Sequence, residues 1–160
     1  MTNLRTGAAG SITAPLPWQL SQWAQLSRGF SASTLAHAYL LCGSEGLGKS
    51  LFAGAFAKYA LCMSPIKADK SSSTEINIAC GECKNCLKCG VGNHPDIIKI
   101  ELEEGSKNIK IDQIRWLSEF VIRSSHSGGA KIAIIEQAHL LNGNAANALL
   151  KTLEEPNDNT

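Results

Sequence analysis

A short segment around residue 45 carries the residue types that capture phosphate. Gly43 is followed after four residues by Gly48-Lys49-Ser50, and Gly46 lies between them. Glycine accepts positive φ, so the backbone can curl until successive N–H groups converge on an anion. Lys49 would add a positive charge for the β- and γ-phosphates, and the Ser50 hydroxyl suits Mg²⁺. The pattern predicts a P-loop that binds a nucleotide such as ATP, and an ordinary glycine-rich turn is the alternative.

A second group of residues suited to chemistry is the run CGECKNCLKC, which places Cys80, Cys83, Cys86 and Cys89 at every third position. Each C-x2-C step lets two sulfurs reach one ion, and a tetrahedral Zn²⁺ site takes four ligands. Cys62 is a fifth candidate, so the fourth ligand is either Cys62 or Cys89, and the local spacing favours Cys89. Disulfides and an iron–sulfur cluster are the alternatives. The iron–sulfur run has a different last spacing and a following proline, whereas a glycine follows here.

Apolar runs and helical spacings predict the elements that would hold these groups. The run Ala38–Cys42 is typical of a strand buried on both faces of a parallel sheet, with Cys42 as a small buried hydrophobe. From Lys49 onward the apolar positions recur at helical spacing, so the glycine turn would connect a strand to a helix. Ile97–Leu102 and Lys131–Ile135 predict two more strands. The predicted fold class is α/β, a parallel sheet flanked by helices.

Three further segments have the spacing of helices that would cover this sheet. The first begins near Pro17, and its two tryptophans would pack against the nucleotide-binding domain. The second would begin at Asp112 as N-cap, with Ile111 and Trp116 spaced as a hydrophobic staple. The third is the last apolar segment, which Pro156 would end. The serine- and lysine-rich stretch 63–79 has no clear periodicity and is predicted to be a loop.

The composition limits the class of protein. A chain of 160 residues that is 44% apolar, with a formal net charge of +1, fits one soluble globular domain. So small a charge gives no broad basic field, so direct tight binding to nucleic acid is not indicated. No signal peptide and no membrane span are recognised, so a reducing cytoplasm is expected, where cysteines favour metals. Residues 1–16 are expected to be flexible and 17–160 to form the nucleotide-binding domain, with 62–96 as a zinc-knuckle insertion.

Taken together, these motifs resemble the clamp-loader AAA+ ATPases of bacterial DNA polymerase III. The resemblance runs from about residue 17 to residue 156. It rests on the P-loop, the cysteine knuckle, the segment GGAKIAIIEQAH and the final NAANALLKTLEEP. The opening PWQ and the turn Asn93-His94-Pro95-Asp96 are more similar to the delta-prime subunits than to the tau/gamma motor subunits. The resemblance therefore implies an AAA+ fold of delta-prime type.

Two residues after the last predicted strand bear on ATP hydrolysis. An ATPase of this family places an aspartate and then a glutamate there, to orient Mg²⁺ and to activate water. This chain has Glu136 and Gln137, and an amide cannot accept a proton. The site is therefore predicted to be degenerate, without catalytic residues and with little or no hydrolysis. For the metal, the resemblance implies Zn²⁺ bound by Cys62, Cys80, Cys83 and Cys86, with Cys89 as an extra thiol.

The resemblance also implies partners. A delta-prime-like chain would be a non-catalytic part of the DNA polymerase holoenzyme, a nucleotidyltransferase, although a weak ATPase activity would be compatible with the intact P-loop. It would contact the tau/gamma ATPases and the delta subunit, and help to load the sliding clamp onto primer-template DNA. A tau/gamma-like motor ATPase is the alternative, and a zinc-knuckle nucleic-acid binder is a weaker one. Because the family continues with a sensor strand, a lid and a collar domain, we expect a truncated part of a longer protein.

Overall fold

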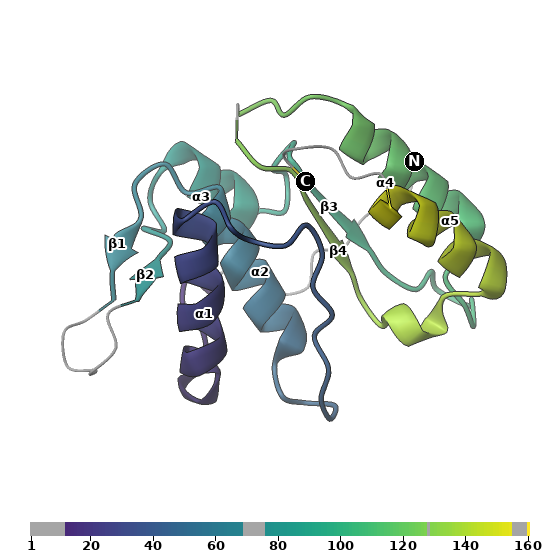
Figure 1. Cartoon of the computed structure of the whole chain (residues 1–160), viewed down its shortest axis with the longest axis horizontal. Helices are drawn as coiled ribbons and strands as arrows, with labels where there is room; N and C mark the ends of the chain where they lie inside the picture. Colours follow the sequence, from purple (N-terminus) through teal and green to yellow (C-terminus); the bar gives the residue numbers. More distant parts are fainter. Residues whose placement is uncertain (1–11, 69–75, 128, 155–159) are drawn as a thin grey trace. The chain divides into compact units, whose positions relative to one another are not determined.

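The computed structural model describes residues 12–68, 76–127, 129–154 and 160. The chain forms two compact units, Met1–His94 and Pro95–Thr160, and each unit has its own hydrophobic core. Helices and short strands occur in both units, as Figure 1 shows, so the α/β composition predicted from the sequence is confirmed.

The first unit is built around two helices that pack side by side. A single turn of 3-10 helix, η2 (Pro17–Gln19), leads into α1 (Leu20–Ser31), and α2 (Lys49–Ala60) follows the glycine segment. Trp23 of α1 is fully buried, and its ring meets the rings of Phe52 and Phe56 edge-on, with centroids 5.7 Å apart in both cases. Edge-to-face rings at this distance add to the stabilisation from burial. Trp23 thus packs against the helix after the glycine segment, as predicted, whereas Trp18 is 60% exposed, so the predicted packing is wrong for Trp18.

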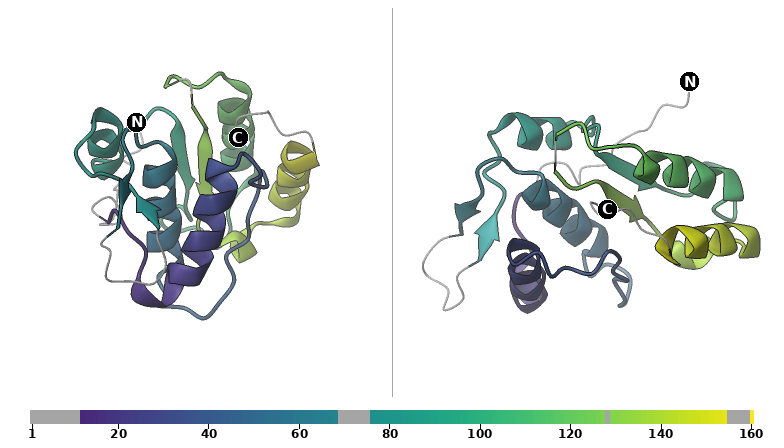
Figure 2. Two further views of the ribbon diagram at one scale, coloured as in Figure 1. Left: turned by 60° about the vertical axis from the view of Figure 1, so that its left-hand side comes forward. Right: turned by 45° about the horizontal axis from the view of Figure 1, so that its top comes forward.

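The insertion that follows α2 contains more regular structure than the sequence indicates. Strands β1 (Ile66–Lys67) and β2 (Asn77–Ile78) pair in an antiparallel ladder, and α3 (Lys84–Gly90) follows them. Figure 2 shows this hairpin beside α1 and α2. The loop predicted for residues 63–79 is therefore wrong at the two strands. Strands of two residues are too short to carry a detectable alternation of apolar and polar positions.

The second unit contains the parallel pair of strands that the apolar runs predict. Strand β3 (Ile97–Ile100) pairs with β4 (Ile132–Ile135), with Ile97 opposite Ile132. Helix α4 (Ile111–Ile122) packs on these strands, and α5 (Gly143–Glu154) packs against α4 (Figure 1). The inward face of α4 is apolar and buried, as its spacing predicts, and consists of Ile114, Leu117 and Val121. The predicted stop of the last helix at Pro156 lies outside the described residues.

The predicted strand at Ala38–Cys42 is wrong. These residues have no strand structure, and their side chains are exposed, Leu40 to 78%. Cys42 is exposed as well, so its interpretation as a buried hydrophobe is also wrong. A strand is stabilised by hydrogen bonds to neighbouring strands, and the one ladder among the described residues of this unit joins β1 to β2. An apolar run indicates a preference for burial but does not specify the partner strand.

The predicted start of α4 is also wrong by two residues. The N-cap is Lys110, and Asp112 lies in the first turn, where its carboxylate pairs with Arg115 at 3.0 Å. The backbone N–H of Lys110 is satisfied by the side-chain oxygen of Gln113, at 3.0 Å. Trp116 is 51% exposed, so the expected staple does not bury it. An aspartate at N-cap and a glutamine at N3 each indicate the start of a helix, and the two indicate different first residues here. The start of α4 follows Gln113 at N3 rather than Asp112.

Candidate phosphate loop and cysteine cluster

The glycine segment forms a turn with positive φ angles at its three glycines. Gly43, Gly46 and Gly48 have φ angles of 148°, 81° and 76°. L side chains rarely adopt these angles, so the turn depends on glycine at these three positions. Gly48 is the N-cap of α2, whose first-turn N–H groups have no acceptor within the helix. This end of the helix can therefore accept an anion.

Lys49, the first residue of α2, bends back over the loop that precedes it. Its ammonium donates hydrogen bonds to the carbonyl oxygens of Gly43 at 2.9 Å and Ser44 at 2.8 Å. An ammonium has three donors, so one remains for a ligand oxygen. Ser50 lies next to it in the first turn of α2. The loop, the cation and the hydroxyl predicted from the sequence are thus neighbours, and this set of groups fits a nucleotide phosphate with Mg²⁺.

A residue that sequence analysis overlooked fixes the other side of this loop. The side-chain nitrogen of Gln19 donates to the carbonyl oxygens of Leu47 at 3.0 Å and Gly48 at 3.2 Å. The indole N–H of Trp18 also donates to Leu47, at 3.3 Å. The available signal was a glutamine three residues after Leu16, which is half of a capping box. Its other half cannot form, because a leucine side chain has no acceptor.

Glu136 and Gln137 follow β4 directly, in the second unit. The carboxylate of Glu136 lies 3.2 Å from the ammonium of Lys99 on β3. Burial alone would lower the pKa of Lys99, but Glu101 and Glu136 outweigh it and raise that pKa. Gln137 has φ 50° and ψ 48°, a left-handed conformation that is rare for residues other than glycine. The phosphate loop belongs to the first unit.

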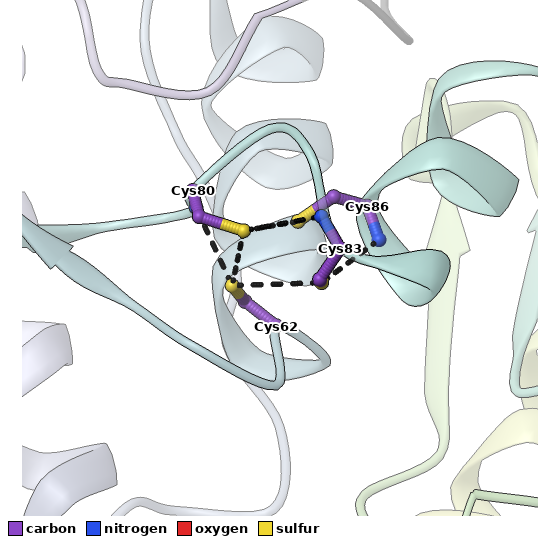
Figure 3. Close-up of side chains that lie close together, drawn as sticks. All are labelled: Cys62, Cys80, Cys83 and Cys86. Atoms are coloured by element: carbon purple, nitrogen blue, oxygen red, sulfur yellow. Dashed lines mark hydrogen bonds between the residues drawn. The ribbon is translucent and has the colours of Figure 1, made fainter.

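Four of the six cysteines form a compact cluster. Figure 3 shows the side chains of Cys62, Cys80, Cys83 and Cys86 pointing toward one another. All four sulfurs lie within 4.8 Å of one another, with Cys62 3.5 Å from Cys80 and 4.0 Å from Cys83. Zn–S bonds of about 2.3 Å place the sulfurs of a tetrahedral site about 3.8 Å apart. The number, type and spacing of these donors therefore fit one Zn²⁺ ion.

Backbone N–H groups point at the sulfurs of the cluster. Cys80 donates to the sulfur of Cys62 at 3.3 Å, Cys83 to that of Cys80 at 3.3 Å, and Cys86 to that of Cys83 at 3.5 Å. Burial alone would raise the pKa of Cys83, but the N–H groups of Cys86 and Met63 lower it to about 6. These donors stabilise thiolates, the form in which cysteine binds a metal.

The other two thiols lie outside the cluster. Cys89, which local spacing favours as a ligand, does not belong to the group of converging sulfurs. Burial raises its pKa to about 11, so it is a protonated thiol at neutral pH. Cys42 is exposed. The geometry thus agrees with the set of ligands that the resemblance implies, rather than with the set that local spacing favours.

The cysteine cluster shares a hydrophobic core with the helix after the phosphate loop. Cys86 is buried in the same core as Phe52 and Tyr59 of α2. The side-chain amide of Asn85 donates to the carbonyl oxygen of Leu61, just beyond the end of α2, at 2.9 Å.

No helix in the described part of the chain is long and apolar enough to cross a membrane.

Comparison with known proteins finds similarity to subunits of DNA polymerase III. The model of the family described as DNA polymerase III, delta subunit, matches residues 18–160. DNA polymerase III subunit delta' of Pseudomonas aeruginosa is 44% identical over 144 residues, covering 90% of this chain and 40% of that protein. The Escherichia coli subunit delta' is 34% identical over 140 residues, which are 88% of this chain and 39% of that protein. The Haemophilus influenzae subunit tau/gamma is 36% identical over 131 residues, which are 82% of this chain and 17% of that protein. The chain thus spans about two fifths of the length of the delta' relatives.

Proposed function

This chain belongs to the family described as DNA polymerase III, delta subunit, and we propose that it acts as part of a delta-prime-like clamp-loader subunit. In that role it takes part in DNA replication by helping to load the sliding clamp onto primed DNA. It binds ATP at the P-loop and hydrolyses little or none of it. The similarity to subunits named delta' over 88–90% of the chain supports this role.

The observation that carries the proposal is the contrast between an intact phosphate loop and an incomplete hydrolytic site. Gly43, Gly46 and Gly48 keep the positive φ angles of an anion-binding turn, and Lys49 lies over it. Gln137 stands where the ATPases of this class place a glutamate, and its amide cannot accept a proton from water. Binding without turnover follows from these two features.

The alternative is a tau/gamma-like motor ATPase, supported by the similarity to subunit tau/gamma and by the complete P-loop. Steady-state hydrolysis separates the two functions. We expect the chain to bind ATP with Mg²⁺, and Lys49→Ala to weaken that binding by at least about tenfold. Turnover should stay near the uncatalysed rate in both forms. Rapid hydrolysis that is abolished by Lys49→Ala would show that the chain is a motor subunit.

For the cysteine cluster we propose a structural Zn²⁺ site in the insertion 62–96. Four thiolates close the coordination sphere, so the ion has no open position for catalysis. It would supply a cross-link to a segment whose regular structure, within its described residues 62–68 and 76–96, consists of two-residue strands and a seven-residue helix. The site is formed by Cys62, Cys80, Cys83 and Cys86.

The partners follow from the proposed role. The chain contacts tau/gamma ATPase subunits and a delta subunit, and it reaches the sliding clamp and primer-template DNA through the complex, in the cytoplasm. Its net charge of +1 supports contact with DNA through the assembly rather than tight binding by this part alone. The 1–16 segment, the AAA+ domain 17–160 and its insertion 62–96 are the proposed divisions of the chain.

A further inference from the structure

We propose that Gln19 is a positioning residue for the phosphate loop, which sets the direction of the N–H groups that bind the triphosphate. This inference rests on the proposed nucleotide-binding function and adds a residue from outside the P-loop motif. Gln19 lies in η2, well before the first glycine of the loop in the sequence. It is buried, with 9% of its surface exposed.

All the polar atoms of the Gln19 side chain are engaged between two segments. Its oxygen accepts the backbone N–H of Leu16 at 3.0 Å, which fixes the side chain on its own turn. Its nitrogen then donates to the carbonyl oxygens of Leu47 at 3.0 Å and Gly48 at 3.2 Å. The amide therefore joins the N-terminal turn to the last two peptide units before α2.

Holding a carbonyl also fixes the N–H group of the same peptide unit. A peptide unit is planar and trans, so its C=O and N–H bonds point in opposite directions. When the carbonyls of Leu47 and Gly48 point at Gln19, the N–H groups of Gly48 and Lys49 must point away from it. These two N–H groups belong to the N-terminal end of α2, where an anion binds. The carbonyl of Gly48 also accepts the N–H of Phe52 at 2.9 Å, so Gln19 acts there together with α2. At the carbonyl of Leu47 Gln19 acts with Trp18, and it thus orients N–H donors that it does not itself supply.

The N-terminal turn packs closely against Gly48, so a side chain would not fit there. A Cβ atom at Gly48 would lie 2.6 Å from a methyl carbon of Leu16 and 3.4 Å from the side-chain nitrogen of Gln19. The indole of Trp18 donates to Leu47 from the same turn, at 3.3 Å. Two side chains of this turn, those of Trp18 and Gln19, thus hold the backbone of the loop by hydrogen bonds. Because these hydrogen bonds act on N–H groups, they affect the phosphates of a ligand and not its base.

The test replaces Gln19 by methionine, which keeps the length of the side chain but has no hydrogen-bonding amide. Gln25→Met is the matched control, because Gln25 is an exposed glutamine of α1. Affinities for Mg²⁺-ATP and for adenosine are measured by calorimetry at a temperature well below unfolding. We expect Gln19→Met to weaken ATP binding about tenfold and adenosine binding less than twofold, and Gln25→Met to change neither. Gln19→Glu should not rescue ATP binding, because a carboxylate cannot donate to the two carbonyls.

A second readout does not depend on nucleotide. In ¹H–¹⁵N spectra of the free chain, the amide signals of Gly48 and Lys49 should shift in Gln19→Met and stay in place in Gln25→Met. Unchanged amide signals, or ATP affinity equal to that of the wild type, would overturn the inference. If the wild-type chain binds no ATP, the proposed function fails, and the amide signals alone decide whether Gln19 orients the loop.

Discussion

Our proposal of Cys62 rather than Cys89 as the fourth ligand rests on the position of each residue in the fold rather than on its spacing in the sequence. Cys62 lies 18 residues before Cys80, yet their sulfurs are 3.5 Å apart, because the β1–β2 hairpin returns the chain to the end of α2. Cys89 lies one turn of helix beyond Cys86 and does not join the converging sulfurs. Sequence separation is thus a poor guide to the fourth ligand wherever a hairpin intervenes.

We therefore predict that Cys62→Ser loses zinc and that Cys89→Ser keeps it. The wild-type chain should retain one Zn²⁺ per molecule after dialysis against a moderate chelator, since four thiolates hold the ion. Cys62→Ser leaves three thiolates and should retain far less under the same conditions. Metal content is measured by mass spectrometry on both variants. The opposite result, loss in Cys89→Ser and full content in Cys62→Ser, would reverse the assignment.

At the scale of elements, a buried carboxylate holds the connection from α4 to β4 against the start of β3. Asp96 is completely buried, and it accepts the backbone N–H groups of His126 at 2.8 Å and Ser127 at 2.9 Å. The buried ammonium of Lys131 donates to the carbonyl oxygen of Arg123 at 2.8 Å, at the other end of this connection. Two buried charges of opposite sign thus hold a connection whose described residues, 123–127 and 129–131, form no helix or strand.

Asp96→Asn should destabilise the chain by about 2 kcal/mol at neutral pH, because a neutral amide is a weaker acceptor for two buried N–H groups. Burial alone would raise the pKa of Asp96, but the N–H groups of His126 and Ser127 outweigh it and lower that pKa below its usual 3.8. The stabilisation is therefore complete above the unfolded pKa and is lost as the pH falls through the lower folded pKa. Urea unfolding is measured for the wild type and for Asp96→Asn between pH 7 and pH 3. The difference between their free energies of unfolding should become smaller as the pH falls.

The matched control for this prediction is Asp112→Asn. Asp112 is an exposed aspartate, with 80% of its side chain accessible, and it pairs only with Arg115 among the ion pairs of the described residues. Exposed pairs of this kind contribute little, so the change should stay within about 0.5 kcal/mol at every pH. If Asp96→Asn and Asp112→Asn lowered the free energy of unfolding equally, the buried carboxylate of Asp96 would stabilise the chain no more than an exposed one.

The elements also show how far sequence patterns reach. The 3.6-residue spacing predicted α1, α2 and the buried face of α4, because each helix has an apolar face that its own unit covers. Asn142 caps α5 by accepting the N–H of Ala145 at 2.8 Å, as its residue type suggests. The run Ala38–Cys42 failed because a strand needs a partner, which periodicity does not specify. Gln19 was overlooked because its role depends on contacts about 28 residues away in sequence, which no local pattern contains.

At the scale of the whole chain, the two units differ in what stabilises them. The core of the first unit combines Trp23 of α1 and Tyr59 of α2 with Ile76, Ala79 and Cys86 of the insertion. The core of the second unit is drawn from β3, α4, α5 and their connections, and it contains no cysteine among the described residues. Because Cys86, a proposed metal ligand, lies in the first core itself, we expect the metal cross-link and the packing of α2 to depend on each other there.

Removal of the metal should therefore loosen the first unit and leave the second unit unchanged. We expect a strong chelator to speed amide hydrogen exchange in α2 and α3 by at least about tenfold, which corresponds to about 1.4 kcal/mol of opening free energy. Exchange in β3, β4 and α4 should not change, because their core holds no proposed ligand. The same chelator saturated with Zn²⁺ is the control, and it should have no effect on either unit. Since α2 begins at the phosphate loop, ATP affinity, measured with Mg²⁺ in excess over the chelator, should fall together with the protection of α2. Equal loosening of both units, or none, would show that the cysteine cluster does not support the nucleotide-binding helix.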